Sequence, residues 1–320
     1  MPPQNGSPME SIVTLTANPA IDISTEVDEI APIRKLRCTA ARRDAGGGGI
    51  NVARVVQRLG SEVAAVYPAG GSTGRLLESL VKREGVRSLA IAVKEETRED
   101  FTVLEQKSGQ QYRFVLPGAP LADPEWQGCL DALKALNKLP SFVVGSGSLP
   151  PAVPEDFYAR AAALAKAGGA KMVVDTSGKA LAAVLREGVY LIKPNLRELQ
   201  ELTHAPLTDP AARVKACRIL IETGAATTVA LTLGADGALL VTREAAHFAR
   251  PPQIKPASAV GAGDSFLGAL IRQIAAGHDI EDAFRQAVAA GAAALLNPGT
   301  ELCRPGDVAR LAEQVVLTTA

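Results

Sequence analysis

The fold of this chain is decided by the stretch Ser258-Ala259-Val260-Gly261-Ala262-Gly263-Asp264-Ser265-Phe266-Leu267-Gly268-Ala269-Leu270-Ile271. Its glycine turn, over positions 261–263, runs directly into an apolar segment rich in small residues, which predicts a buried helix. The turn therefore lies at a helix N-terminus, where unpaired backbone N–H groups and the helix dipole attract an anion. Because glycine has no side chain, an anion can approach the backbone of this turn closely.

Asp264 follows the turn, and it is a poor ligand for an anion because a carboxylate repels a bound phosphate. It is better suited to take the proton from a hydroxyl group that attacks the phosphate. The alternative is that Asp264 is an ordinary N-cap residue of the helix. The stretch alone leaves both interpretations open.

A second glycine turn, Gly46-Gly47-Gly48-Gly49, leads into another helical segment, Ile50-Asn51-Val52-Ala53-Arg54. The third glycine of a dinucleotide-binding fingerprint is replaced here by Asn51, and the segment contains no Gly-Lys-Ser/Thr of a P-loop. This pattern disfavours an NAD-dependent dehydrogenase.

The two turns lie about two hundred residues apart, and the pair resembles the paired signatures of the ribokinase-like (PfkB) carbohydrate kinases. In that family the first turn holds the sugar and the second holds the anion of the transferring phosphoryl group. The resemblance extends from Thr14-Leu15-Thr16 to Asn297-Pro298-Gly299-Thr300 and is strongest to the bacterial 6-phosphofructokinases of the ribokinase type. The other segments that carry it are Lys35-Leu36-Arg37-Cys38-Thr39-Ala40, Pro68-Ala69-Gly70-Gly71, Gln111-Tyr112-Arg113-Phe114-Val115, Gly145-Ser146-Gly147-Ser148-Leu149-Pro150-Pro151 and Lys193-Pro194-Asn195.

The resemblance implies an α/β, ribokinase-like fold of three layers, with a mostly parallel central sheet and a small antiparallel β lid. It implies a single kinase domain over residues 11–320, with lid segments at about 22–44 and 97–117. The residue pattern agrees, because both lid segments alternate apolar and charged residues, as strands with one wet face do. From position 141 onward short apolar strands alternate with helical segments, which is typical of a parallel sheet covered on both faces. We expect the final helices over 280–296 and 305–317.

The function implied is the ATP- and Mg²⁺-dependent phosphorylation of the 1-hydroxyl of fructose 6-phosphate to fructose 1,6-bisphosphate. The alternatives within the class are 1-phosphofructokinase and tagatose-6-phosphate kinase. Four consecutive glycines favour the first activity, because 1-phosphofructokinases of the family commonly carry Lys at the third of these positions. The alternative from another class is a sensor of nucleotide and sugar phosphate without catalysis, which the intact Gly261-Ala262-Gly263-Asp264 argues against.

The resemblance places catalysis in Asp264 as the base and Gly261, Ala262 and Gly263 as the anion hole. It also implies a sugar site, whose residues include a basic cluster that suits a substrate phosphate. The sugar-site residues are Asp22, Gly47, Gly48, Asn51 and Ser148, with Lys35, Arg37 and Arg98 converging on the phosphate. The alternatives are that Asp22 is a solvated loop acid and that the basic residues form an ordinary solvated face.

Two further sets of residues are expected on the nucleotide side. Asn195 and Glu198 stand three apart on one helical face, so both could reach Mg²⁺ directly or through water, as in the Asn-x-x-Glu motif of the family. The alternative is an Asn-capped helix with an exposed Glu. The nucleotide residues implied are Lys193, Asn195, Thr232, Gly234 and Gly237. A monovalent cation, K⁺ in the family, is expected at Ser258, Val260, Asn297 and Gly299, although Ala259 replaces the usual Thr.

Composition excludes several other classes. Lys plus Arg equal Asp plus Glu at 34 each, which argues against nucleic acid or an anionic membrane as the main partner. The four cysteines are far apart and there are only three histidines, so a zinc site is not expected. Residues 1–10 are polar, lack the apolar core of a signal peptide and are expected to form a disordered tail. With no apolar run long enough to cross a bilayer, a cytoplasmic protein is expected.

A homodimer joined through the lids is expected, because a small sheet that is open on one face exposes apolar side chains and unpaired edges. The apolar lid positions available for this contact are Ile23, Val27, Ile33, Phe101, Val103, Tyr112 and Phe114. Two positions depart from the similar kinases: Ala31 replaces a Tyr that reaches the neighbouring subunit's sugar site, and Arg197 replaces a Lys.

Overall fold

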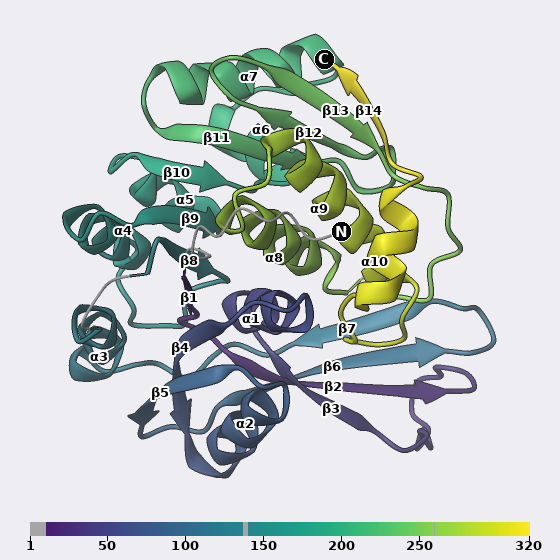
Figure 1. Cartoon of the computed structure of the whole chain (residues 1–320). Coiled ribbons are helices and arrows are strands. Elements are labelled where there is room, and N and C mark those ends of the chain that lie inside the picture. The colour runs from purple at the N-terminus through teal and green to yellow at the C-terminus, as the bar shows by residue number, and fades with distance from the viewer. Residues whose placement is uncertain (1–10, 137–139, 259) are drawn as a thin grey trace.

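A computed structural model describes residues 11–136, 140–258 and 260–320 (Figure 1). A ten-stranded sheet runs through the molecule in the order β14-β13-β12-β11-β10-β9-β8-β1-β4-β5. All its pairs from β5 to β11 are parallel, and the three strands beyond β11 pair antiparallel. The strands are β1 (Ile12–Leu15), β4 (Val63–Gly70), β5 (Arg87–Val93), β8 (Phe142–Ser146), β9 (Lys171–Asp175), β10 (Val189–Ile192), β11 (Ala226–Thr232), β12 (Ala238–Val241), β13 (Ala246–Arg250) and β14 (Val316–Thr319). The mostly parallel sheet is confirmed.

Helices cover both faces of this sheet and bury two separate apolar cores (Figure 1). One face carries α1 (Gly48–Arg58), α2 (Gly71–Arg83), α8 (Ala262–Ala275), α9 (Ile280–Leu295) and α10 (Pro305–Ala312). The other face carries α3 (Asp123–Lys134), α4 (Phe157–Ala167), α5 (Gly178–Val184), α6 (Leu196–Thr203) and α7 (Pro210–Glu222). The three-layer prediction is confirmed.

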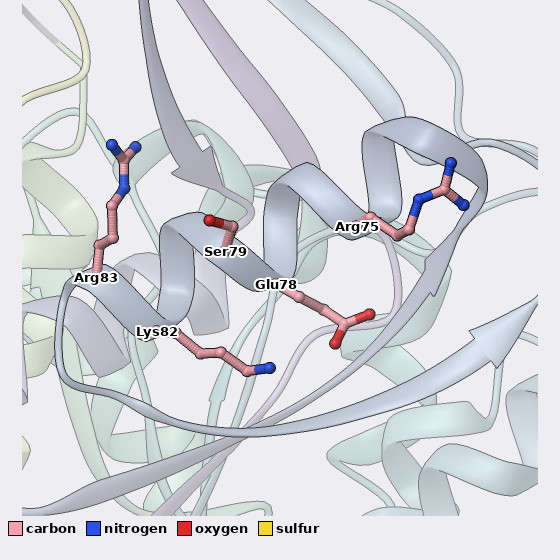
Figure 2. Close-up of a pocket in the computed structure, with 5 residues that line it drawn as sticks. All are labelled: Arg75, Glu78, Ser79, Lys82 and Arg83. Carbon is pink, nitrogen blue, oxygen red and sulfur yellow. The ribbon is translucent and has the colours of Figure 1, made fainter.

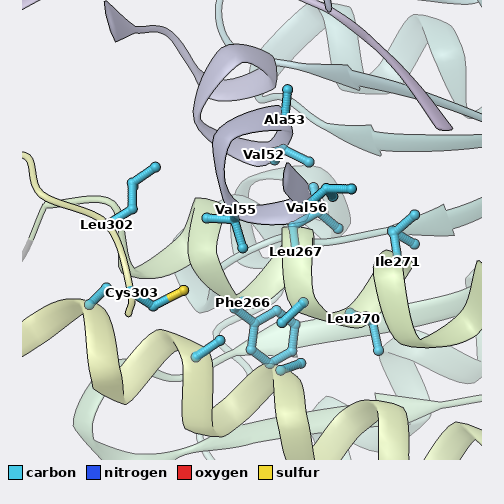
Figure 3. Packing of buried hydrophobic residues seen from close by; sticks show 14 of the residues in the cluster. Val52, Ala53, Val55, Val56, Phe266, Leu267, Leu270, Ile271, Leu302 and Cys303 are labelled. Atoms are coloured by element: carbon cyan, nitrogen blue, oxygen red, sulfur yellow. The ribbon is translucent and has the colours of Figure 1, made fainter. Parts of the chain in front are cut away.

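Helices α1 and α8 pack closely against each other because a glycine stands at their contact. A Cβ atom added to Gly268 would lie 2.7 Å from Val55 Cγ1, so no larger residue fits without moving one helix. Figure 3 shows Val52, Val55 and Val56 of α1 beside Phe266, Leu267 and Ile271 of α8. This packing sets the two glycine turns, which lie at the N-termini of these helices, next to each other.

The lid is a separate four-stranded sheet in the order β3-β2-β6-β7. Its strands are β2 (Ala20–Val27), β3 (Arg42–Gly46), β6 (Arg98–Glu105) and β7 (Gln111–Val115). The outer pairs β2–β3 and β6–β7 are antiparallel as expected, whereas the central pair β2–β6 is parallel. The lid is thus confirmed, with a mixed centre that joins its two predicted segments.

Two features, one in the lid and one at the C-terminal end, differ from expectation. Ile23 and Val27 are buried within the chain itself, so they are not available for a contact between subunits. The predicted helix over 305–317 is wrong beyond Ala312, because Val316–Thr319 instead pairs with β13 at the edge of the sheet. An apolar run of this length satisfies its backbone equally well as a strand when an open edge is available. The predicted tail at 1–10 lies outside the described residues.

A hollow on the solvent-facing side of α2 is lined by Arg75, Glu78, Ser79, Lys82 and Arg83 (Figure 2), and none of them belongs to the predicted site. Within the described part of the chain, none of the helices has the length and apolar character needed to cross a membrane.

Candidate active site

The candidate active site lies where the N-termini of α1 and α8 meet the carboxyl ends of the central strands, the usual ligand position in an open parallel sheet. The N-cap residues are Gly47, with φ of 104°, and Gly261, with φ of 77°. Both angles favour glycine strongly. The first N–H groups of each helix have no partner within the helix, so both turns present donors to the same space.

The four glycines at 46–49 are required by close neighbours on all sides. A Cβ atom at Gly46 would overlap the carboxyl group of Asp22, and one at Gly48 would overlap Ser146 Oγ at the end of β8. One at Gly49 would lie 3.0 Å from the carbonyl oxygen of Leu15. The turn therefore fits between the lid and the ends of β1 and β8 only without side chains.

Asp264 is the third residue of α8, and its carboxylate is not the N-cap of the helix. Its Oδ2 accepts a hydrogen bond of 2.9 Å from Asn51 Nδ2 of α1. Burial and the neighbouring Asp175 raise the pKa of Asp264 to about 6, against the opposing effects of Asn51, Lys193 and Arg113. Such a carboxylate is ionised at neutral pH and still basic enough to accept a proton from a hydroxyl group. The capping alternative is excluded by this geometry.

Lys193 brings a buried positive charge to the second turn. Its Nζ lies 3.1 Å from Asp175 Oδ1, and a Cβ atom at Gly263 would be 3.3 Å from the same Nζ. Although burial opposes its charge, the carboxylates of Asp175, Asp264 and Glu198 raise the pKa of Lys193. A cation therefore stands beside the predicted anion hole.

Asp175 belongs to the site and was not among the predicted site residues. It ends β9, and it affects the pKa of Lys193, Asp264 and Glu198 alike. The signal in the sequence is Asp175-Thr176-Ser177, a polar run directly after a buried strand. The carboxyl end of a parallel strand is where such side chains reach a ligand.

Asn195 and Glu198 form a reciprocal capping box at the start of α6. Asn195 Oδ1 accepts from Glu198 N at 2.9 Å, and Glu198 Oε2 accepts from Asn195 N at 2.8 Å. Burial, followed by the charge of Asp175, raises the pKa of Glu198. The two residues thus cap the helix, while the Glu198 carboxylate also faces the charged end of the site.

The predicted nucleotide residues are brought together beside this cap. Asn195 and Thr232 form a parallel bridge, and Thr232 Oγ1 donates to the carbonyl oxygen of Pro194. Gly234 and Gly237 shape the turn after β11, with φ of 63° and 113°. The bridge thus brings the end of β11 beside the start of α6, two residues after Lys193.

Asp22 and Asn51 also lie near Asp264. Asp22 is buried, and its burial and the neighbouring Asp100 raise the pKa of Asp22 to about 7, while Arg54 and Arg113 act in the opposite direction. Asp22 and Asp264 also affect each other electrostatically, so the two carboxylates share one site. Ser148 is exposed at the end of β8 and accepts a 3.1 Å hydrogen bond from Asn18.

The structure does not bring Lys35, Arg37 and Arg98 together within one chain. Arg98 is level with Ala20 at the root of the lid, whereas Lys35 and Arg37 lie in the exposed loop beyond Val27 at its far end. The Arg98 guanidinium is held by Asp100 at 2.9 Å and by two backbone carbonyl groups. A single chain therefore forms no clamp from these three cations.

Arg113 of β7 is a cation of the site that sequence reasoning missed. It is exposed, and its charge lowers the pKa of Asp22, Asp100 and Asp264. One guanidinium group thus lies near all three carboxylates. Its place in an alternating strand made it look like an ordinary solvent-facing residue.

The predicted monovalent-cation residues come from two loops that meet. Ser258 Oγ donates to the carbonyl oxygen of Gly299 at 2.7 Å and accepts from Val260 N at 3.2 Å. Asn297 is buried, and its Nδ2 donates to the carbonyl oxygens of Ala293 and Leu302. Ala259 lies outside the described residues. These contacts join the segment that precedes the 261–263 turn to the loop that follows α9.

The sequence matches the description "pfkB family carbohydrate kinase" over residues 10–306. The chain therefore belongs to the pfkB family of carbohydrate kinases. It is 44% identical over 302 residues to an ATP-dependent 6-phosphofructokinase isozyme 2 of Mycobacterium tuberculosis, covering 94% of this chain and 89% of the relative. It is 41% identical over 304 residues to the Escherichia coli protein of the same description, covering 95% and 98%.

Solved structures agree with this relationship. The crystal structure of Escherichia coli phosphofructokinase-2 in complex with fructose-6-phosphate has a TM-score of 0.90 and 39% identity, covering 96% of this chain and 99% of that one. The same protein in complex with potassium gives a TM-score of 0.91 at 40% identity, with the same coverage. The chain is also 38% identical over 262 residues to a 1-phosphofructokinase of Xanthomonas campestris, covering 81% and 82%.

Proposed function

We propose that this chain, as one kinase domain with a β lid, transfers the terminal phosphoryl group of ATP to the 1-hydroxyl of fructose 6-phosphate. The observation that carries the proposal is the Asp264 carboxylate, which is hydrogen-bonded by Asn51 and lies at the N-terminus of α8 beside Lys193. It combines a proton acceptor with donors for a transferring phosphoryl group. The similarity to 6-phosphofructokinases at 41–44% identity supports the choice of acceptor.

In this reaction Asp264 accepts the proton from the 1-hydroxyl as its oxygen attacks the terminal phosphorus of ATP. The N–H groups of Gly261, Ala262 and Gly263, together with Lys193, stabilise the negative charge on the transferring oxygens. Asn51 holds the carboxylate in place, and the ADP oxygen leaves on the opposite side. Positioning and charge stabilisation supply most of the catalysis in phosphoryl transfer.

The residues on the nucleotide side fit a Mg²⁺–ATP complex. The half-buried Glu198 carboxylate and the Asn195 amide oxygen are hard oxygen donors of the type Mg²⁺ prefers, directly or through water. When bound, Mg²⁺ neutralises phosphate charge. Thr232, Gly234 and Gly237 then flank the nucleotide.

The meeting of the Ser258 and Gly299 loops fits a monovalent cation coordinated by oxygen atoms, with Val260 and Asn297 nearby. The crystal structure of the Escherichia coli relative with potassium supports this choice of ion. Equal reaction rates in K⁺ and in tetramethylammonium at constant ionic strength would exclude a requirement for K⁺.

The substrate follows from the charges on the sugar side. Asp22 and Ser148 offer hydrogen-bonding groups to sugar hydroxyls, while Arg113 offers a positive charge that only a phosphorylated sugar would use. Rates of ADP release should therefore rank fructose 6-phosphate well above fructose and ribose. The same panel includes fructose 1-phosphate and tagatose 6-phosphate, and a higher kcat/KM for either would replace fructose 6-phosphate as the substrate.

We infer a homodimer joined through the lids. The lid exposes apolar side chains at Ile33 and Leu36, in the loop beyond β2, and at Phe114, Val115 and Leu116, at the end of β7. Such a contact would give Lys35 and Arg37, at the far end of the lid, a neighbouring sugar site to reach. A crystal structure of the Escherichia coli relative is described as a tetrameric inhibited form, so larger assemblies also occur among similar proteins.

Light scattering at micromolar concentration is expected to give the mass of a dimer, and Phe114→Glu is expected to give a monomer with reduced activity. A charge in an apolar interface costs desolvation without a partner. The matched control is Ile219→Glu on α7, which introduces the same charge at another exposed apolar position. A wild-type monomer with full activity would contradict the dimer.

The proposed location is the cytoplasm, because the proposed reaction consumes ATP and a sugar phosphate, both products of cytoplasmic metabolism. Cell fractionation followed by the ADP-release assay tests this, and activity confined to the membrane or extracellular fraction would contradict it.

A further inference from the structure

Arg54 of α1 is a fully buried cation whose guanidinium group touches several elements. Its Nη1 donates to the carbonyl oxygen of Ala45 at 2.7 Å and to Asn51 Oδ1 at 3.1 Å. Its Nε and Nη2 donate to Glu84 Oε1 at 3.1 and 3.0 Å, and Nη2 lies 3.5 Å from Asp44 Oδ1. One guanidinium thus joins lid strand β3, helix α1 and the C-terminal end of α2.

Arg54 is not needed merely to neutralise the Glu84 carboxylate, because Arg58 already pairs with it. Arg58, one turn further along α1, donates to both oxygens of Glu84, at 2.8 and 2.6 Å. Removing a cation from water is costly unless its partners compensate for the loss. Among their hydrogen bonds given above, Arg54 has bonds to Ala45, Asn51 and Asp44 that Arg58 lacks, and of these three partners Asn51 is the one that is hydrogen-bonded to Asp264.

The bond from Arg54 to Asn51 determines which way the Asn51 amide points. An arginine can only donate hydrogen bonds, so it must face the amide oxygen, and the amide nitrogen must then face Asp264. The Asn51 Nδ2 group donates to Asp264 Oδ2 at 2.9 Å, as this orientation requires. With the amide turned over, its oxygen would face the carboxylate and the two would repel each other.

We propose that Arg54 is a positioning residue for phosphoryl transfer: it fixes the Asn51 amide so that the NH₂ group holds the Asp264 carboxylate, and it ties this pair to lid strand β3. The inference rests on the proposed kinase function. The proposal adds to the site a residue that does not contact the substrate and that lies at the root of the lid.

The charged groups that face Asp264 from other elements remain unchanged when Arg54 is altered. They are Asp175 at the end of β9, Lys193 after β10, Arg113 on β7 and Asp22 on β2. Loss of the oriented Asn51 hydrogen bond should therefore appear as a rise in the pH at which kcat is half-maximal. The expected rise is about one unit, which corresponds to one hydrogen bond to a charged group.

The test compares Arg54→Lys with Arg58→Lys in the full-length protein. Lysine keeps the charge but has a single nitrogen, which cannot donate to Ala45, Asn51 and Glu84 in the same geometry. Arg54→Lys is expected to lower kcat about tenfold and to shift the acid limb of the pH profile upward, with KM for ATP changed less than twofold. Arg58→Lys is expected to leave kcat and the pH profile within twofold and 0.2 units, roughly the precision of such assays.

A second variant, Asn51→Asp, tests the other end of the contact in case Arg54→Lys folds poorly. Aspartate still accepts from Arg54 but turns a carboxylate oxygen, in place of an N–H, toward Asp264, so kcat is expected to fall at least tenfold and the acid limb to move upward. Wild-type kinetics in Asn51→Asp, or matching kinetics in Arg54→Lys and Arg58→Lys, would overturn the inference. An inactive wild type would instead overturn the proposed function.

Discussion

Replacement of Asp264 by Asn is expected to lower kcat by roughly 10²–10⁴-fold, the usual contribution of a positioned base. The amide has nearly the same shape, so the fold and ATP binding should persist. The reason for the large effect is that Asp264 accepts the proton of the attacking hydroxyl from a site shaped by Asn51 and Lys193. The loss of kcat is measured by steady-state kinetics with fructose 6-phosphate and ATP.

The matched control is Asp279→Asn, which makes the same change at the N-terminus of another helix. Asp279 is the N-cap of α9 and accepts from Asp282 N at 2.8 Å, a bond that an asparagine oxygen also accepts. It should leave kcat unchanged. An Asp264→Asn variant with more than a tenth of the wild-type kcat would remove Asp264 from the mechanism.

The wild-type rate should fall as the pH is lowered through about 6. The pKa of Asp264 is raised to about 6 by burial and by Asp175, so below that pH the carboxyl group is protonated and cannot act as a base. The Asp264→Asn variant should lose this acid limb from its residual rate.

Replacement of Arg113 by Ala is expected to raise KM for fructose 6-phosphate tenfold or more and to leave KM for ATP nearly unchanged. A charge-assisted hydrogen bond to a phosphate contributes about 1.5–3 kcal/mol, and 1.4 kcal/mol corresponds to a factor of ten. Arg113 is exposed on β7 near Asp22, Asp100 and Asp264, on the sugar side of the site.

Arg87→Ala is the control for this change, because Arg87 is also exposed on a strand but lies at the start of β5 in the main sheet. Both KM values should match the wild type in that variant. If Arg113→Ala weakens ATP alone, or if KM for fructose 6-phosphate moves less than twofold, Arg113 does not contact the substrate phosphate.

The sequence predicted best those features that depend on a short stretch of the chain. The glycines at 46–49 and 261–263 predicted two helix N-termini, and α1 and α8 begin there. Local patterns sufficed for these two turns because each depends on residues that are near one another in the chain. The role of Asp264 was predicted only with the resemblance to the kinase family, since the stretch alone left the N-cap alternative open.

Features that depend on distant pairing could not be predicted in the same way. Whether β2 pairs with β6 parallel or antiparallel depends on the path of the chain between them, and Val316–Thr319 became a strand only because β13 offers an open edge. Arg54 and Arg113 look like ordinary polar positions in a helix and a strand. Only the folded chain shows that one is buried against Asn51 and that the other faces three carboxylates.

The most direct test of the central claim is the identity of the product formed from fructose 6-phosphate and ATP, followed by ³¹P NMR. The account predicts a new phosphate ester on the 1-hydroxyl, formed in equal amount to ADP, with the rate reduced at least a hundredfold in Asp264→Asn. Phosphorylation at another position, or release of ADP with free phosphate and no new ester, would contradict it.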